Sequence, residues 1–125
     1  MNTDSFTDGY IECALWSSND ESTSEGGEPL DANYSREDFA EETLRLFAAE
    51  CAEFQRQNES DLAEFAEVTG RPDDHAGHDF WLTRNGHGAG FWDRGAGDVG
   101  DRLTDACKAW GEIHLYVGDD GKLYA

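Results

Sequence analysis

The segment 78–94 constrains this chain more than any other, because it concentrates aromatic residues and glycines. Two aromatic runs, 80–82 and 91–92, flank the dipeptide Asn85-Gly86, and two further glycines follow it. An Asn-Gly pair between apolar runs favours a tight β-hairpin, because both central residues of a type I′ turn need a positive φ. We therefore predict a Trp-rich β-hairpin that carries two of the four tryptophans on its strands.

The middle of the chain predicts two helices. Ser35, with Asp38 three residues later, forms the carboxylate variant of a capping box, and apolar residues follow at helical spacing. This first helix should end near Gln57. Ser60 is placed to cap a second, shorter helix, which Gly70 should end.

The remaining elements give an α+β order. They are a strand at 10–16, a polar loop at 17–28, a linker at 73–77, a helix at 101–110 and strands at 80–84, 90–93, 112–117 and 122–124. We expect one domain, 1–125, with 1–34 partly irregular, acidic helices at 35–70, and hairpin, helix and C-terminal hairpin at 78–125. The helical N-terminal half should pack on a small antiparallel sheet that includes the Trp-rich hairpin.

The net charge of −19 is extreme for 125 residues. Residues 1–74 hold 20 acids and 4 bases, whereas residues 75–125 hold 8 acids and 5 bases. A halophilic protein would spread its acidic residues over the whole surface, so this asymmetry argues against adaptation to high salt. The charge argues against direct binding to nucleic acid or to an anionic membrane, and it indicates a basic partner or a cation.

Carboxylates recur along the two predicted acidic helices and the linker after them. Duplex DNA presents one negative charge per roughly 1.7 Å of its axis, and a helix with carboxylates at each turn approximates such a row. The alternative is an ordinary solvated helix surface. The candidate partner-binding residues are Glu37, Glu41, Glu42, Glu53, Asp61, Glu64, Glu67, Asp73 and Asp74.

Three cysteines, Cys13, Cys51 and Cys107, lie far apart among apolar neighbours. An odd number of isolated cysteines predicts small reduced core residues in a cytoplasmic protein. The sequence has neither a basic region followed by an apolar run nor a run of about 18 apolar residues. We therefore expect no membrane partner.

Histidines and carboxylates cluster just before the predicted hairpin. His75, His78 and Asp79 are ligand types that suit zinc, manganese or non-haem iron. Their spacing matches no closed zinc pattern, and a polar linker whose histidines form local hydrogen bonds is the simpler explanation. We expect no metal and no cofactor, and keep these three residues as the alternative metal site.

A second polar group surrounds the predicted turn. Arg84, His87 and Asp93 could act together in acid–base chemistry, with the histidine as proton shuttle. No nucleophile motif accompanies them, and an arginine–aspartate pair within a tight hairpin is the simpler explanation. The sequence therefore leans away from an enzyme.

The run from His78 to Arg94 resembles a signature of small acidic accessory proteins of bacteriophages and prophages, and the similarity extends to 44–57, 103–110 and 115–121. The resemblance implies an accessory phage gene, and it carries over no catalytic or binding residues. Small acidic accessory phage proteins often blunt host defence by occupying nucleic-acid channels.

Charge and resemblance together lead to one main hypothesis. The chain is expected to be a phage-type inhibitor in the host cytoplasm, an acidic nucleic-acid mimic that blocks the basic nucleic-acid-binding surface of a restriction or CRISPR effector. Two alternatives stay open. One is a small enzyme, with or without a metal, centred on Arg84, His87 and Asp93, and the other is an assembly protein that docks through the Trp-rich hairpin.

Overall fold

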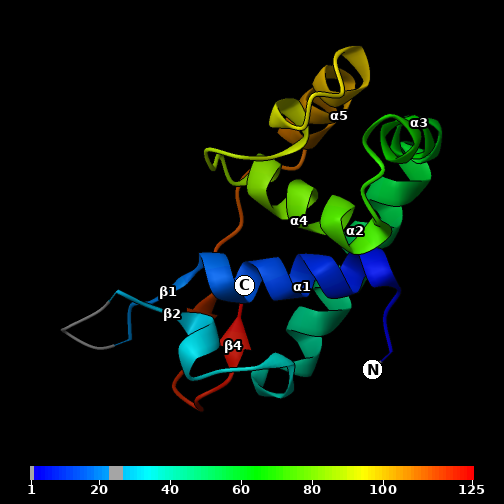
Figure 1. Ribbon diagram of the computed structural model, residues 1–125. Helices are drawn as coiled ribbons and strands as arrows, with labels where there is room; N and C mark the ends of the chain where they lie inside the picture. Colours follow the sequence, from blue (N-terminus) through cyan, green and yellow to red (C-terminus); the bar gives the residue numbers. More distant parts are fainter. Residues whose placement is uncertain (1, 23–26) are drawn as a thin grey trace.

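The structure, a computed structural model, describes residues 2–22 and 27–125. The described residues are mostly helical, with two small antiparallel ladders, so the fold is α+β in the broad sense (Figure 1). The α-helices are α1 (Ser5–Ser17), α2 (Glu41–Gln57), α3 (Glu59–Thr69), α4 (Asp73–Arg84) and α5 (Asp98–Lys108). The 3₁₀ turns are η1 (Leu30–Ala32), η2 (Arg36–Asp38) and η3 (Phe91–Asp93). Strand β1 (Asn19–Asp20) pairs with β2 (Glu28–Pro29), and β3 (Tyr116–Val117) pairs with β4 (Leu123–Tyr124).

Helices α1 and α4 pack against each other at the centre of the molecule (Figure 1). Two glycines lie where their backbones meet. A Cβ on Gly77 would overlap the carbonyl oxygen of Phe6, and a Cβ on Gly9 would overlap the carbonyl oxygen of Asp74. The close approach of the two helices therefore depends on the absence of side chains at both positions.

Aromatic rings fill the core around this helix pair. Phe54 and Phe80 are stacked with ring centroids 4.0 Å apart. Tyr10 meets Phe47 and Trp81 edge to face, at centroid distances of 5.0 and 5.2 Å. All five rings are buried, and aromatic side chains bury the most apolar area per residue.

The predicted Trp-rich hairpin is wrong. Residues 73–84 form α4, and residues 91–93 form the turn η3. The pairs Phe80-Trp81 and Ala76-Gly77 are buried four residues apart, which is helical spacing, and α4 is covered on several sides. The apolar run 80–82 therefore belongs to a central helix, whereas its composition predicts a strand.

The Asn-Gly pair ends this helix rather than turning a hairpin. Asn85 is the C-cap of α4, and Gly86 has φ +68°, the left-handed conformation common just after a helix. The expected positive φ at one of these two residues is confirmed at Gly86, although in a different setting.

Two further predictions near α1 and α4 are wrong. Residues 10–16 lie in α1, whose N-terminus is capped by Asp4: its carboxylate accepts a hydrogen bond of 2.8 Å from the backbone N–H of Thr7. The expected linker at 73–77 is the first turn of α4, which follows Pro72. Each of these helices contains a glycine, Gly9 in α1 and Gly77 in α4, and glycine lowers helix propensity, so the sequence did not predict a helix there.

The predicted helix ends at Gln57 and Gly70 are confirmed, whereas the predicted N-caps are wrong: Ser60 lies inside α3, whose N-cap is Asn58. The Ser35 N–H donates to the Asp38 carboxylate at 2.8 Å, but this contact closes η2, and α2 begins only at Glu41. Gly70 ends α3 with φ +71°. The third helix runs over 98–108, three residues before its predicted start, and the C-terminal hairpin is present with strands of two residues.

The three cysteines are buried and unpaired, as predicted. Burial raises the pKa of the Cys13 and Cys107 thiols to about 12. At neutral pH these thiols stay protonated and unreactive. None of the helices in the described ranges is long and apolar enough to span a bilayer.

Candidate functional site

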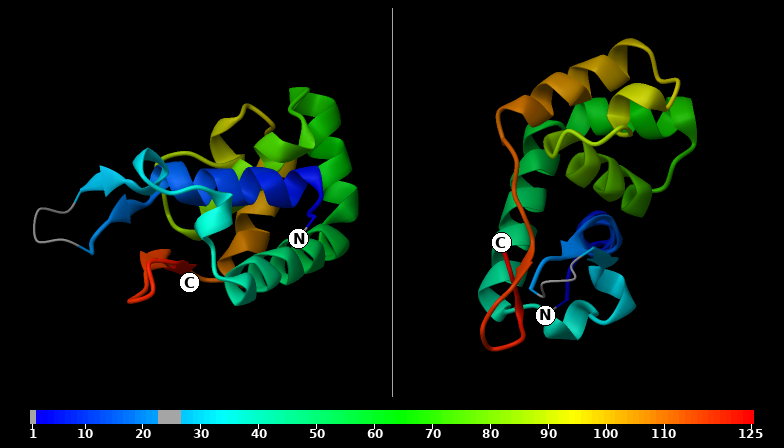
Figure 2. Two further views of the ribbon diagram at one scale, coloured as in Figure 1. Left: turned by 90° about the horizontal axis from the view of Figure 1, so that it is seen from below. Right: turned by 90° about the vertical axis from the view of Figure 1, so that its left-hand side faces the viewer.

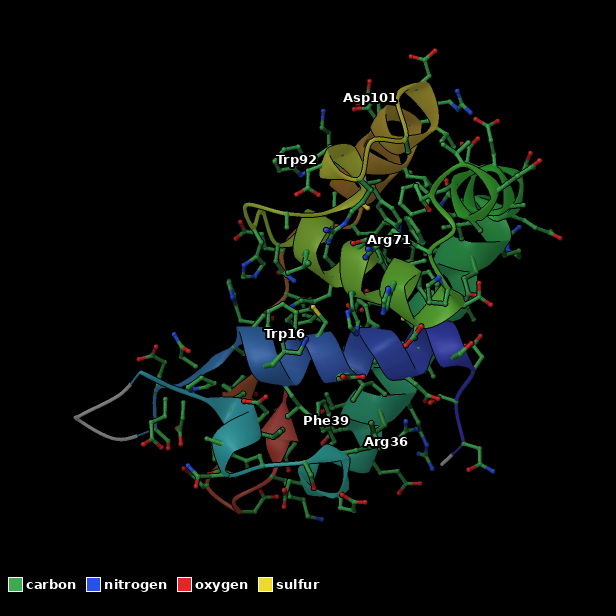
Figure 3. All side chains as sticks on the ribbon, viewed as in Figure 1. Trp16, Arg36, Phe39, Arg71, Trp92 and Asp101 are labelled. Atoms are coloured by element: carbon green, nitrogen blue, oxygen red, sulfur yellow. The ribbon has the colours of Figure 1, made fainter. Side chains whose placement is uncertain are left out.

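Asp79 lies at the centre of the first buried charge cluster. Its side chain is fully buried on α4, and two arginines from outside the helix reach it (Figure 3 labels Arg71). Arg71 donates through Nε and Nη2 at 3.0 and 3.1 Å, and Arg94 donates through the same two atoms at 3.0 and 2.8 Å. Burial raises the pKa of the Asp79 carboxyl, and the two guanidiniums oppose that rise.

Arg84 forms a second buried cluster at the end of α4. Its Nη1 donates to the hydroxyl of Tyr10 at 3.1 Å and to the carboxylate of Glu50 at 3.2 Å. Its Nε and Nη2 donate to the carbonyl oxygens of Gly111 and Trp110 at 2.9 and 3.0 Å. Arg84 therefore ties α4 to α1, α2 and the chain after α5, which is a structural role.

The residues of the alternative catalytic site have separate surroundings. Arg84 is buried among the partners just named, whereas His87 is exposed on the loop after α4. Asp93 accepts a hydrogen bond of 3.0 Å from the Gly90 N–H and lies 3.6 Å from the Nε of Arg94. Among the described residues, no hydrogen bond or ion pair joins any two of the three, so this geometry gives the enzyme hypothesis no support.

The residues of the alternative metal site also diverge. The rings of His75 and His78 are stacked with centroids 5.6 Å apart, while Asp79 is taken up by its two arginines. The Nε2 of His78 is buried without a hydrogen bond, 3.9 Å from the carboxylate of Glu12. In the part of the chain that is described, no three His, Cys, Asp or Glu side chains form a metal-binding group. The absence of a metal stays a prediction, which elemental analysis tests.

The nine predicted partner-binding residues lie along α2, α3, the start of α4 and η2. Six are exposed and Glu53, Asp61 and Asp74 are half-buried. Helices α2 and α3 run along the outside of the molecule and turn a corner at Asn58 (Figure 2). Glu59, which the sequence reasoning missed, is exposed at this corner. We call these ten carboxylates the acidic edge.

Bases neutralise the acidic edge only in part. Glu41 pairs with Arg45, Glu53 with Arg56, and both Asp61 and Glu64 with Arg102 of α5. These pairs are exposed and contribute little to stability individually. Within the described ranges, no ion pair involves the other six carboxylates of the acidic edge, which are Glu37, Glu42, Glu59, Glu67, Asp73 and Asp74.

The interior uses up bases that could have offset this charge. Among the described residues, eight of the nine bases form ion pairs with carboxylates. Three of them, Arg71, Arg84 and Arg94, turn inward to three carboxylates, those of Asp79, Glu50 and Asp93. This inward group is neutral as a whole, so the rest of the protein carries the full net charge of −19.

The tryptophans divide into buried and exposed ones. Trp81 is buried beside Tyr10 and donates its Nε1–H to the hydroxyl of Ser17 at 2.8 Å. Trp16 is 43% exposed on α1 and Trp92 is 50% exposed on η3 (Figure 3). A docking role for tryptophan, if there is one, therefore belongs to Trp16 or Trp92, and no hairpin presents it.

Comparison of the chain with protein-family models, with curated proteins and with solved structures finds no match. The resemblance of 78–94 to small phage proteins stays a prediction. The charge of the protein and its placement are therefore the features that bear on function.

Proposed function

We propose that this protein is a phage-type inhibitor that acts in the host cytoplasm. It mimics nucleic acid with its acidic edge and blocks the basic nucleic-acid-binding surface of a host defence complex, such as a restriction or CRISPR effector. The observation that carries this proposal is the uncompensated charge: eight of the nine bases turn inward or form exposed pairs, while six carboxylates of the acidic edge have no ion pair among the described residues.

A surface of unpaired carboxylates lowers the stability of the folded protein, so a function is needed to explain it. Exposed like charges repel each other and destabilise the compact state. The same field attracts a basic partner over a distance of about one Debye length, roughly 8 Å at physiological ionic strength. Electrostatic attraction of this kind raises association rates and selects partners by charge.

The spacing of the charges in α3 supports mimicry of a nucleic-acid strand. Glu59, Asp61, Glu64 and Glu67 lie within nine residues, which span about 12 Å of helix axis at 1.5 Å per residue. This gives one carboxylate per about 4 Å, close to the one phosphate per 3.4 Å of a single DNA strand. Because α2 and α3 meet at a corner at Asn58, the complete row of carboxylates along the two helices is bent rather than straight.

A DNA-displacement assay tests the proposal. Purified CRISPR and restriction effectors would be loaded with fluorescent target DNA, and loss of fluorescence anisotropy would be followed as this protein is added. The edge variant replaces Glu42, Glu59 and Glu67 by Lys, because these exposed residues hold no other element in place. The control variant replaces Glu28, Asp31 and Asp119, which are exposed elsewhere, and has the same net charge.

We expect the parent and the control variant to displace DNA from at least one effector, and the edge variant to fail. Addition of NaCl should weaken displacement by the parent. Equal displacement by edge and control variants would contradict mimicry by the acidic edge. Loss of displacement only in His87→Ala or Trp92→Ala would move the function to the loop after α4.

A further inference from the structure

A groove runs between β1 and the extended chain that leads into β3. It consists of two hollows of about 450 and 130 Å³. Both hollows are lined by Asn19 and Glu21 on one side and by Leu115 and Tyr116 on the other, so they are continuous. We call this the β1–β3 groove. Figure 2 shows the chain after α5 running in an extended path toward β3.

One wall of the groove is the edge of β3, where backbone N–H and C=O groups are not used by the β3–β4 ladder. The Gly118 N–H donates to the Lys122 carbonyl at 2.7 Å, and bonded pairs alternate along an antiparallel ladder. The pair of Val117 and Leu123 is therefore a non-bonded pair, whose backbone groups point outward. The Leu123 carbonyl indeed accepts from the Ala40 N–H at 3.0 Å, on the far side from β3. The N–H and C=O of Val117 point the opposite way, away from β4.

Leu115 continues this edge. It precedes Val117 by two residues, so in an extended chain its N–H and C=O share the same direction. Among the described residues, no hydrogen bond involves the backbone of Leu115, and the ladder leaves that of Val117 unused. Both residues line the smaller hollow. The wall therefore presents donors and acceptors at every second residue.

The opposite wall of the groove, formed by β1, is also a strand edge with backbone groups that its own ladder does not use. The Leu30 N–H donates to the Ser18 carbonyl at 2.8 Å, which makes these two residues a bonded pair of the β1–β2 ladder. By the same alternation, the backbone groups of Asn19 point away from β2. Asn19 lines both hollows, so the groove has strand edges on its two sides.

The side chains around the groove favour a cationic occupant. Glu21 lines both hollows, and Tyr116, which is 55% exposed, is shared with a third, open hollow lined by Asp119, Asp120 and Tyr124. Among the described residues, no Lys or Arg lines any of the three, and the basic side chains that do line the larger hollow are the histidines His87 and His114. An exposed tyrosine beside carboxylates is a favourable place for a lysine or arginine side chain.

We propose that an extended, basic segment of a partner protein binds in the β1–β3 groove as an added strand. Its backbone pairs with Leu115 and Val117 on one side and with Asn19 on the other, and a basic side chain lies on Tyr116. Strand addition obtains affinity from main-chain hydrogen bonds and selectivity from alternate side chains. The inference goes beyond the proposed function, because it concerns a different surface and does not depend on nucleic-acid mimicry.

A titration with synthetic peptides tests this inference without the partner. The ¹⁵N-labelled protein would be titrated with the acetylated, amidated hexapeptide Lys-Val-Lys-Val-Lys-Val and followed by NMR. We expect the amide signals of Leu115, Val117 and Asn19 to shift and their hydrogen exchange to slow. A second peptide is N-methylated at its two central residues, which keeps every charge but removes donors on both edges. It should bind about tenfold more weakly.

Two variants complete the test. Val117→Pro removes the outward N–H of the β3 edge, and proline is tolerated on an edge strand. We expect it to weaken binding of the unmodified peptide, while Glu67→Lys on α3 leaves binding within about twofold. Equal affinities for the two peptides, or shifts confined to the acidic edge, would overturn the proposal. Should Val117→Pro fail to fold, the comparison of the two peptides decides alone.

Discussion

Charged side chains have opposite surroundings in two regions, the contact between α1 and α4 and the acidic edge. At the centre of the molecule, the carboxylate of Asp79 is fully buried and held by two arginines. Along the acidic edge, carboxylates such as Glu42 and Glu67 are exposed and have no ion pair among the described residues. One region satisfies its charges within the fold, and the other leaves them available to a partner.

This difference indicates which residues stabilise the fold and which are free for binding. The stretch 78–94, with its aromatic rings and polar residues, has the composition of a functional site, yet several of its apolar side chains lie in the core, and Asp79, Arg84 and Arg94 are paired inside the protein. Acidic helix surfaces usually receive the simpler explanation of solvation. Here they keep the charge that the interior does not neutralise.

The largest expected effect is at the contact between α1 and α4. Gly77→Ala places a methyl group on the carbonyl oxygen of Phe6, so the helices must separate. We expect the free energy of unfolding in urea to fall by more than about 3 kcal/mol. Gly88→Ala is the matched control, since nothing lies within 4 Å of its Cβ position, and it should change stability by less than about 0.5 kcal/mol. Equal effects would show that the close helix contact is not important for stability.

Removal of the buried carboxylate should be nearly as damaging. Asp79→Asn keeps the shape of the side chain but leaves Arg71 and Arg94 facing a neutral amide. We expect a loss of about 3 kcal/mol, because an unpaired buried charge is left behind. On the acidic edge, Glu64→Gln should cost less than about 1 kcal/mol in the same urea titration. Comparable losses would contradict the contrast between the two regions.

A smaller effect is expected where α4 ends. Gly86 has φ +68°, which a β-branched residue adopts only with strain. Gly86→Val should lower the free energy of unfolding by about 1–2 kcal/mol, whereas Gly86→Asn should cost less, because asparagine tolerates this conformation. A valine variant as stable as the parent but unable to displace DNA would instead assign this glycine to partner binding.

The smallest effect concerns pH. Burial lowers the pKa of His78 below its ordinary value of 6.5, and the nearby Glu12 carboxylate opposes this. The unfolded chain therefore binds the proton more readily, so stability falls as the pH drops through 6.5 toward the lower folded value. His78→Phe should lose less stability than the parent between pH 8 and pH 5.5, while His87→Gln at an exposed position should follow the parent. Identical losses in all three proteins would remove His78 from this account.

The sequence predicted those parts of the fold that are encoded locally. The contact of Ser35 with Asp38, the left-handed Gly70 and the pairing of 116–117 with 123–124 each depend on a few neighbouring residues. The acidic residues along α2 and α3 could also be identified, because helical spacing is a short-range pattern.

The rest depended on contacts that short-range patterns do not contain. Gly9 and Gly77 look like helix breakers until two helices cross at them. Asp79 resembled a metal ligand, because its partners Arg71 and Arg94 lie 8 and 15 residues away and meet it only in the fold. A usable signal for α4 did exist: Asp73 and Asp74 after a proline, with apolar pairs four residues apart, favour a helix.

The most direct test of the central claim is the salt dependence of association with an effector from which the protein displaces DNA. The association rate of the parent, measured by stopped flow, should fall steeply between about 0.1 and about 1 M NaCl, because the Debye length falls from about 10 Å to about 3 Å over this range. The variant with Glu42, Glu59 and Glu67 changed to Lys should associate slowly and depend little on salt, and the control variant should resemble the parent. A parent rate that is flat in salt, and unchanged by these reversals, would contradict the account.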